Sequence, residues 1–279
     1  MAFITTKKLT KSQKQILENF IKKSFPNITK YIKKIIICKE SELVKTVHCW
    51  DETISFTGFK GCNVSGKTIS YYDKSIVFLT IQVIEKIIKN TQTQASNDGQ
   101  IILNKESLLA LKNVFHEIGH AKKEYKFGKI NVKEDADNYE EMLNELWKIL
   151  RDEYIAEMSC AKLIEFSHSI NWYGDFDDNL ESENLIHYMS SYTEKGKKLN
   201  GAFVLQLLHQ YYFVPLFKKA GFLKAALKIL SENNIFACKT IKDINKCNVL
   251  ENRYVPIIFN DIVLRKWNDF NLIEYVENL

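Results

Sequence analysis

Glycine and proline are scarce along the whole chain, and this scarcity constrains its fold more than any other feature of the sequence. The 279 residues include only 10 glycines and 3 prolines. Since these two residue types most often interrupt helices, their scarcity predicts long helices. With 46% hydrophobic residues the chain can also build a substantial core, which is not typical of disordered or collagen-like proteins. We therefore expect a helix-rich globular protein.

The composition of the chain predicts no nucleic-acid partner and no membrane span. The net charge is only +5, and just three of the 39 basic residues are arginines, namely Arg151, Arg253 and Arg265. Proteins that bind bases or phosphates usually do so through arginine side chains, so we expect no nucleic-acid partner. The longest uncharged stretch, 199–217, carries polar residues at helical spacing, which favours a buried helix and predicts no membrane span.

The cysteines and the N-terminus predict a reducing, cytoplasmic setting. The six cysteines are scattered and form no C-x-x-C pair, so no zinc ribbon or redox motif is indicated. The first residues, MAFITTKKLTKSQK, lack a continuous apolar segment, so no signal peptide is visible. An unconventional export route would leave the same trace in the sequence.

The order of sequence patterns predicts an α+β protein with a small mixed sheet and a mostly helical C-terminal half. Apolar residues recur at helical spacing over 11–38, interrupted by Pro26, whereas residues 43–80 contain short β-prone runs with a turn at Tyr72–Ser75. The remaining expectations are a surface loop at 91–100, a helix from Asn104 to Gly128, a second helix at 137–166, a loop at 167–182 and helices through 184–230.

We expect these elements to form one compact catalytic unit with two parts. Residues 1–100 would hold the N-terminal helical segment and the sheet, and residues 101–279 would hold the helices that carry the chemistry. The polar residues described next lie in this second part.

The segment His116-Glu117-Ile118-Gly119-His120 is an H-E-x-x-H motif. Residues four apart lie on the same face of a helix, so both imidazoles can bind one Zn²⁺. Glu117 would then be the general base for a water bound to the metal. The apolar residues around the motif predict a largely buried helix, in which two histidines need polar partners. Hydrogen-bonded core histidines are the alternative.

The next predicted helix offers carboxylates for a third ligand. Its apolar stripe, continued at a spacing of three to four residues, reaches Glu153 and Glu157. Buried carboxylates need a cation or hydrogen-bond donors. A metal would satisfy one of them, and a hydrogen bond to a ligand imidazole would satisfy the other. The alternative is that both lie just off the stripe, in water or paired with lysine.

The H-E-x-G-H motif followed by Glu153-Tyr154-Ile155-Ala156-Glu157 resembles the gluzincin metallopeptidases, in particular the lethal-factor-like and ImmA/IrrE-type peptidases. The resemblance covers about residues 104–166. It implies a zincin-like fold, His116, His120 and Glu153 as zinc ligands, Glu117 as the catalytic base and Glu157 as a support behind a ligand. It also implies that an edge strand, best matched by residues 68–79, binds an extended protein or peptide substrate.

The sequence departs from these families at one functional position. The lethal-factor-like pattern carries a tyrosine one to two turns before the third ligand, where it donates to the oxyanion, but Leu146 and Trp147 lie there in this chain. The candidates to replace this donor are Tyr192, His209, Tyr211 and Tyr212. A zincin-fold binding or regulatory protein without proteolysis is therefore the first alternative to a zinc metallopeptidase. Metzincins are excluded, because Lys123 and Lys126 occupy the positions of their further glycine and histidine.

A second motif, residues 61–68, matches the G-x-x-x-x-G-K-[ST] pattern of phosphate-binding P-loops. A P-loop requires a helix that begins at the Gly-Lys-Thr, so that its N-terminus can bind phosphate. The residues that follow, Ile69–Tyr72, are β-prone instead. We therefore interpret the segment as part of a hairpin or loop and keep a nucleotide-binding protein as the second alternative.

Overall fold

The computed structural model describes residues 4–6, 9–54, 65–91, 103–129, 139–167, 171–173 and 209–232. The chain divides into two compact units. One contains Met1–Ile130 and Ile155–Tyr173, and the other contains Asn131–Tyr154 and Gly174–Leu279. The division predicted at residues 100 and 101 stays a prediction.

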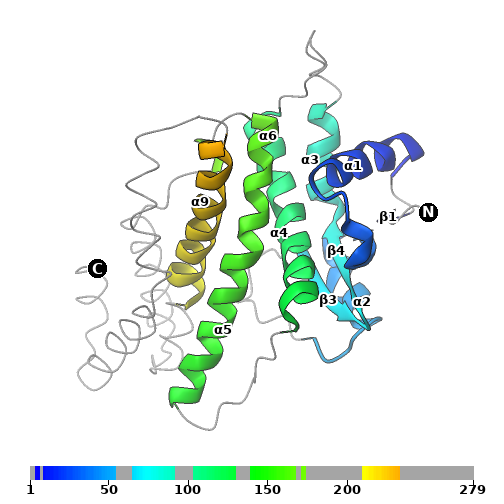
Figure 1. Ribbon diagram of the computed structural model, residues 1–279. Helices are drawn as coiled ribbons and strands as arrows, with labels where there is room; N and C mark the ends of the chain where they lie inside the picture. The colour runs from blue at the N-terminus through cyan, green and yellow to red at the C-terminus, as the bar shows by residue number, and fades with distance from the viewer. Residues whose placement is uncertain are drawn as a thin grey trace, which may run out of the picture. The chain divides into compact units, whose positions relative to one another are not determined.

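The first unit contains a small mixed sheet (Figure 1). Its described strands lie in the order β1-β2-β4-β3, where β1 is Ile4–Thr5, β2 is Ile32–Cys38, β3 is Gly66–Tyr71 and β4 is Lys74–Thr80. Strands β1, β2 and β4 run parallel to one another, whereas β3 pairs antiparallel with β4 and forms an edge. An α+β protein with a small mixed sheet before the H-E-x-x-H helix is thus confirmed.

Strand β2 contradicts the helical pattern predicted over residues 11–38. Helix α1 covers only Lys11–Ser24, capped by Thr10, and the chain then passes through a 3-10 turn, η1 (Ile28–Lys30), into β2. Consecutive isoleucines occupy positions 35–37, and β-branched side chains pack well on a pleated strand that is covered on both faces. A run that is apolar at every position fits a buried strand as well as a helix, so its spacing alone was misleading.

Among the described residues of the predicted sheet region, 43–80, strands occur at Gly66–Tyr71 and Lys74–Thr80, whereas residues 55–64 lie outside the described part. Residues Glu40–Glu42 form a 3-10 turn, η2, and Leu43–His48 form a short helix, α2, so the prediction was wrong there. The predicted turn is confirmed in position. It lies at Tyr72 and Asp73, where Tyr72 has a φ of 54°, and Lys74 and Ser75 already belong to β4. Helix α3, Ile81–Thr91, was not predicted, and residues 92–100 of the predicted loop lie outside the described residues.

Helix α4, Lys105–Phe127, carries the H-E-x-x-H motif and agrees with the predicted boundaries. The side chain of Asn104 accepts a hydrogen bond from the Ser107 amide at 2.9 Å and caps its N-terminus. Gly128, with a φ of 81°, ends it, because this left-handed backbone is disfavoured for residues that carry a Cβ atom. The caps are local signals, which explains why the sequence predicts this helix so closely.

The segment predicted as one helix over 137–166 is helical but changes type along its length. Helix α5 covers Tyr139–Glu157, a 3-10 segment η3 follows at Met158–Leu163, and α6 covers Ile164–Ser167. The predicted loop at 167–182 is described only at its start, where Asn171–Tyr173 form the 3-10 turn η4. Residues 139–154 of α5 belong to the second unit, and residues 155–157 belong to the first.

In the second unit, the described residues near the C-terminus form a π-helical turn, η5 (His209–Phe213), followed by helix α9 (Val214–Glu232). They agree with the helices predicted through 184–230, whose earlier residues lie outside the described part. Within the described residues, no helix combines the length and the apolar content that crossing a membrane requires. The prediction of no membrane span agrees with this finding.

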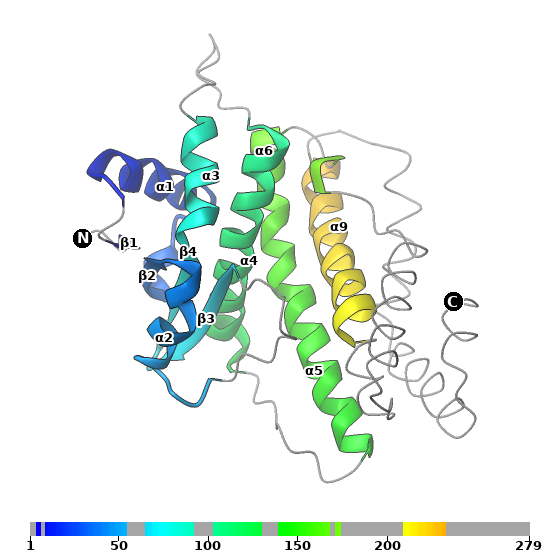
Figure 2. The ribbon, with the colours of Figure 1, turned by 180° about the vertical axis from the view of Figure 1, so that it is seen from behind.

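Two different surfaces cover the faces of the sheet in the first unit. On one face, α2 contributes Leu43 and Val47 to a cluster with Ile69, Ile76 and Phe78. On the other face, α4 packs against β3 and β4, and α3 lies beside α4 (Figures 1 and 2). The core side of α4 is mostly apolar around the motif, with buried residues Leu111, Val114, Phe115 and Ile118. The motif is therefore held on a largely buried helix.

Gly119, inside the motif, allows the chain around Ala156 to approach α4 very closely. A Cβ atom at position 119 would overlap the backbone carbonyl of Ala156. Because these atoms belong to the backbone and not to a flexible side chain, moving them away would cost free energy. The glycine therefore fixes the distance between α4 and the end of α5.

Substitution of Gly119 by alanine should destabilise the protein, although alanine favours helices. Overpacking costs about 1–3 kcal/mol, whereas the gain in helix propensity is only about 1 kcal/mol. We expect Gly119→Ala to lower the denaturant midpoint, while Lys126→Ala, at an exposed position of the same helix, leaves the free energy of unfolding nearly unchanged. A Gly119→Ala variant as stable as the parent would contradict this packing.

Candidate metal centre

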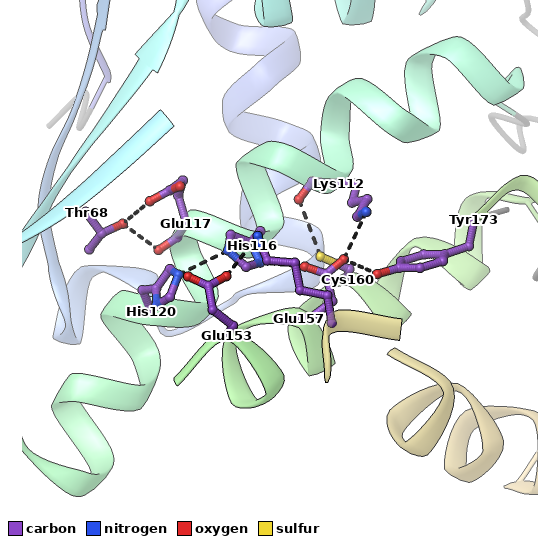
Figure 3. Close-up of polar contacts among 10 residues, drawn as sticks. Thr68, Lys112, His116, Glu117, His120, Glu153, Glu157, Cys160 and Tyr173 are labelled. Carbon is purple, nitrogen blue, oxygen red and sulfur yellow. Dashed lines mark hydrogen bonds and ion pairs between the residues drawn. The ribbon is translucent and has the colours of Figure 1, made fainter. Parts of the chain in front are cut away.

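Helix α4 brings the imidazoles of His116 and His120 together (Figure 3). They lie one turn apart on the same face, and their Nε2 atoms are 3.1 Å apart. The ring planes are perpendicular, with centroids 4.7 Å apart. His116 is 8% exposed, and His120 is partly buried. The predicted pairing of the two nitrogen atoms is therefore present in the structure.

The separation of the two Nε2 atoms fits a shared metal ion. Two nitrogens at tetrahedral positions, about 2.0–2.1 Å from one zinc, lie about 3.3 Å apart. Two nitrogen lone pairs facing each other across 3.1 Å repel unless a proton or a cation lies between them. The arrangement thus permits either a hydrogen bond from one imidazole to the other or a metal bound by both.

The other ring nitrogen of His116 contacts Glu157, which decides between the tautomers of this histidine. His116 Nδ1 lies 2.5 Å from Glu157 Oε2, and the Glu157 side chain is only 1% exposed. A carboxylate accepts hydrogen bonds, so Nδ1 carries the proton and donates. A neutral His116 then has its lone pair on Nε2, the atom that faces His120. This is the tautomer that a metal ligand in this position requires.

Glu157 is itself held by two further groups. Lys112 Nζ lies 3.2 Å from Glu157 Oε1, and the Tyr173 hydroxyl donates to the same oxygen. Burial, and then the negative charge of Glu157, raise the pKa of Tyr173 well above its ordinary value, so its hydroxyl stays protonated and donating. The buried carboxylate therefore has a donor or a cation on each oxygen.

Glu153 lies on α5 one turn before Glu157, so the two carboxylates project from the same face of one helix. Glu153 belongs to the second unit, so its place as the third ligand stays a prediction. Glu153 also forms an ion pair of 2.8 Å with Lys218 on α9. A lysine partner is one of the alternatives that the sequence leaves open for this carboxylate.

Glu117 points away from its two histidine neighbours, toward strand β3. Thr68 Oγ1 lies 2.7 Å from Glu117 Oε2 and 2.9 Å from the backbone carbonyl oxygen of Glu117, so its one proton is shared between two acceptors. A Cβ atom at Gly66 would lie 2.7 Å from Glu117 Cγ. The glycine therefore lets the edge strand approach this carboxylate, and Thr68 orients it.

A second carboxylate of α4 is held by the sheet in a similar way. Glu124 Oε1 accepts from Ser70 at 3.0 Å, and Glu124 Oε2 accepts from Ser75 at 2.9 Å. The two serines are cross-strand neighbours on β3 and β4. Together with Thr68 they fix the register of α4 on the sheet, because their hydroxyls lie on the face of β3 and β4 that α4 covers.

A different combination of potential ligands shares His116. The side chains of His116, Glu157 and Cys160, all buried, also gather within 4.8 Å. The Cys160 thiol lies 3.4 Å from the backbone carbonyl oxygen of Lys112 and donates to it. In this group, however, Glu157 uses Oε2 to accept from His116 Nδ1. A metal bound by these three residues would have to break that hydrogen bond, so the pair of Nε2 atoms is the better candidate.

The end of the P-loop-like segment is part of the site but does not have P-loop structure. Gly66, Lys67 and Thr68 begin strand β3, and residues 61–64 lie outside the described part. Because no helix begins at Thr68, these residues do not form the helix N-terminus that binds phosphate in a P-loop. Thr68 instead contacts Glu117.

The sequence patterns point to His116 and Glu157, which lie in contact, but not to the residues that hold Glu157 and Glu117. Lys112 has a local signal that those patterns leave out, because it lies one turn before His116 on the same helix. Thr68 and Tyr173 have none, since their partners are 49 and 16 positions away in the sequence. Tyr192, Tyr211 and Tyr212, which could replace the missing tyrosine, lie outside the described side chains.

Comparison with known proteins gives no match: no protein-family model, no curated protein and no solved structure matches the chain. The assignment of a function therefore depends on the geometry of the site and on the residues that form it.

His209, another candidate for the missing donor, is buried in the second unit and lies 3.3 Å from the Leu146 carbonyl oxygen. Burial lowers the pKa of His209 from 6.5 to about 4, although the contact with Leu146 and the charge of Glu153 act in the opposite direction. The folded protein therefore keeps this histidine neutral at pH 5, whereas the unfolded chain protonates it.

This difference predicts a loss of stability in acid. Between pH 6.5 and about 4 the unfolded chain binds the extra proton, so the free energy of unfolding falls as the pH falls, by about 2 kcal/mol at pH 5. His209→Gln keeps an N–H donor for the Leu146 carbonyl but cannot be protonated. We expect this variant to lose less stability than the parent between pH 7 and pH 5, measured by urea unfolding. Equal losses would show that His209 is not held neutral.

Proposed function

We propose that the protein is a zinc-dependent metallopeptidase with a zincin-like fold, which hydrolyses a peptide bond of a protein or peptide. One observation carries the proposal. Two Nε2 atoms from one buried helix lie 3.1 Å apart, and the Nδ1 atom of one of these imidazoles is held by a buried carboxylate. Such an arrangement presents two lone pairs to the same point, as a metal site requires.

His116, His120 and Glu153 would hold the zinc. Two imidazoles and one carboxylate are a donor set that zinc accepts in catalytic sites, where a fourth position stays open. When bound, zinc makes a coordinated water acidic and polarises the carbonyl of a substrate.

Glu117 would be the general base. It lies next to His116 on α4 and is the carboxylate that the motif provides for accepting the proton of the attacking water. The Thr68 hydroxyl, 2.7 Å from Glu117 Oε2, fixes the direction of this side chain and leaves the other oxygen to accept a proton. Thr68 thus prevents Glu117 from rotating freely and holds its carboxylate beside the edge strand.

The position of the edge strand supports the proposed substrate class. Strand β3 pairs with β4 on one side, and within the described sheet it is the last strand in the order. It also contacts Glu117 through Thr68. An extended peptide that adds to β3 through backbone hydrogen bonds would pass close to the base. This supports a polypeptide substrate, which is also what the resemblance to gluzincins implies.

A binding or regulatory protein that keeps the metal but does not cleave is the second candidate. The observation that favours it concerns the place of the missing tyrosine. Trp147 packs edge-on against Phe217, with ring centroids 5.6 Å apart, and Leu146 contributes only its carbonyl oxygen, to His209. Leucine has no side-chain donor, and neither residue offers the phenolic hydroxyl that the lethal-factor-like pattern carries at this place. The P-loop alternative is disfavoured, because Gly66–Thr68 form a strand.

Zinc content and hydrolysis of one set of variants separate these candidates. We expect the full chain to bind one zinc per molecule and to cleave members of a broad peptide library. His116→Ala and Glu153→Ala should lose zinc, and Glu117→Gln should keep zinc and lose at least 100-fold in rate. Zinc content is measured by mass spectrometry and cleavage by peptide mass fingerprints.

Glu106→Gln provides the matched control, because it makes the same chemical change at an exposed position of the same helix. This variant should keep both zinc and activity. Stoichiometric zinc that survives both His116→Ala and Glu153→Ala would contradict the site. Zinc binding without cleavage of any peptide would favour the binding protein.

A further inference from the structure

A buried polar cluster lies behind His116, on the side away from His120 (Figure 3). Its centre is the Glu157 carboxylate, and its two oxygens contact different residues. Oε2 accepts from His116 Nδ1, whereas Oε1 receives the Lys112 ammonium and the Tyr173 hydroxyl. All four residues belong to the first unit. The proposed reaction assigns no part to Lys112 or Tyr173.

Lys112 is fixed in its place from two directions. Its Nζ atom lies 3.2 Å from Glu157 Oε1 and 4.3 Å from the centroid of the Tyr173 ring. Its side chain is 24% exposed, so most of it is removed from water. An ammonium that contacts both a carboxylate and the face of an aromatic ring is restricted in direction. Lys112 therefore holds Glu157 Oε1 in one position.

Tyr173 holds the same oxygen, Glu157 Oε1, from a different element of the first unit. It lies on η4, and its hydroxyl donates to Glu157 Oε1. Because burial and the charge of Glu157 keep this phenol protonated, it acts as a donor and not as a second anion. Two donors on Oε1 leave Oε2 directed at His116.

The direction of Oε2 decides which nitrogen of His116 is protonated. With the carboxylate in place, the proton is on Nδ1 and the lone pair is on Nε2. If Glu157 rotates away, the proton can move to Nε2, where it blocks a metal ligand. Lys112 and Tyr173, which hold Oε1, would therefore act on a bound metal through Glu157 and His116.

We propose that Lys112 and Tyr173 are positioning residues that set the zinc affinity of His116 by holding Glu157. The inference rests on the proposed function, because it takes His116 as a ligand. It adds a determinant of metal affinity that lies outside the H-E-x-x-H motif and outside the resemblance.

The first test measures zinc affinity by competition with a chromophoric chelator. Lys112→Met and Tyr173→Phe should each weaken zinc binding about 10-fold, at the lower end of the effects of groups that orient ligands. Lys112→Arg, which keeps the cation, should retain most of the zinc affinity of the parent. Lys126→Met, at an exposed position of α4, is the matched control and should leave the affinity unchanged.

Double variants then show whether the two residues act through Glu157. In a Glu157→Gln background, Lys112→Met and Tyr173→Phe should change zinc affinity less than about 2-fold, because the carboxylate that they hold is gone. A full 10-fold effect in that background would overturn the inference.

The second test needs no activity and no zinc. Nitrogen-15 chemical shifts of the imidazoles in the metal-free full chain report the tautomer of His116, whose signals are identified by their loss in His116→Ala. We expect the Nδ1–H tautomer in the parent and a larger share of the Nε2–H tautomer in Lys112→Met and Tyr173→Phe. An unchanged tautomer together with unchanged zinc affinity in both variants overturns the inference.

These outcomes differ from a failure of the proposed function. If His116→Ala abolishes zinc binding while Lys112→Met and Tyr173→Phe leave affinity and tautomer unchanged, the positioning role is wrong and the metal site stands. If zinc binding survives His116→Ala, the metal site is wrong and the inference falls with it.

Discussion

The hydrogen bond between His116 and Glu157 is the interaction on which the arrangement of the site depends. It joins α4 to the end of α5 across 41 sequence positions, and it is buried on both sides. Gly119 makes the close approach of the backbone possible, because any side chain there would meet Ala156. A buried carboxylate without partners is costly, so this contact contributes to stability only because Glu157 is satisfied by donors. The same donors define the tautomer of His116.

The sheet supports the other side of the centre. Thr68 contacts Glu117, and the serine pair Ser70 and Ser75 holds Glu124 two turns further along α4. These hydroxyls alternate along β3 with the apolar residues that face α2, so one short strand has an apolar face and a polar face. The contact of Glu117 with the edge strand is thus a direct consequence of the two-residue period of a strand.

Local signals explain what could be predicted from the sequence. Asn104 and Gly128 bound α4, and the spacing of the motif brings His116 and His120 together, because both depend on residues within a few positions of one another. The helical stripe likewise placed Glu157 on the core side of α5. Strand β2 was missed because its isoleucines fit either period, and Thr68 and Tyr173 were missed because only tertiary packing brings them to their partners. The roles of the site residues stay predictions.

Zinc K-edge X-ray absorption of the full chain, loaded with one equivalent of zinc, tests the central claim most directly. We predict two imidazole nitrogens at about 2.0–2.1 Å, with the remaining ligands oxygen and no sulfur. The two imidazoles would be His116 and His120, and Glu153 would supply one of the oxygens. A sulfur ligand at about 2.3 Å would place the metal at Cys160 instead, and a shell of oxygens without imidazole would contradict the site altogether.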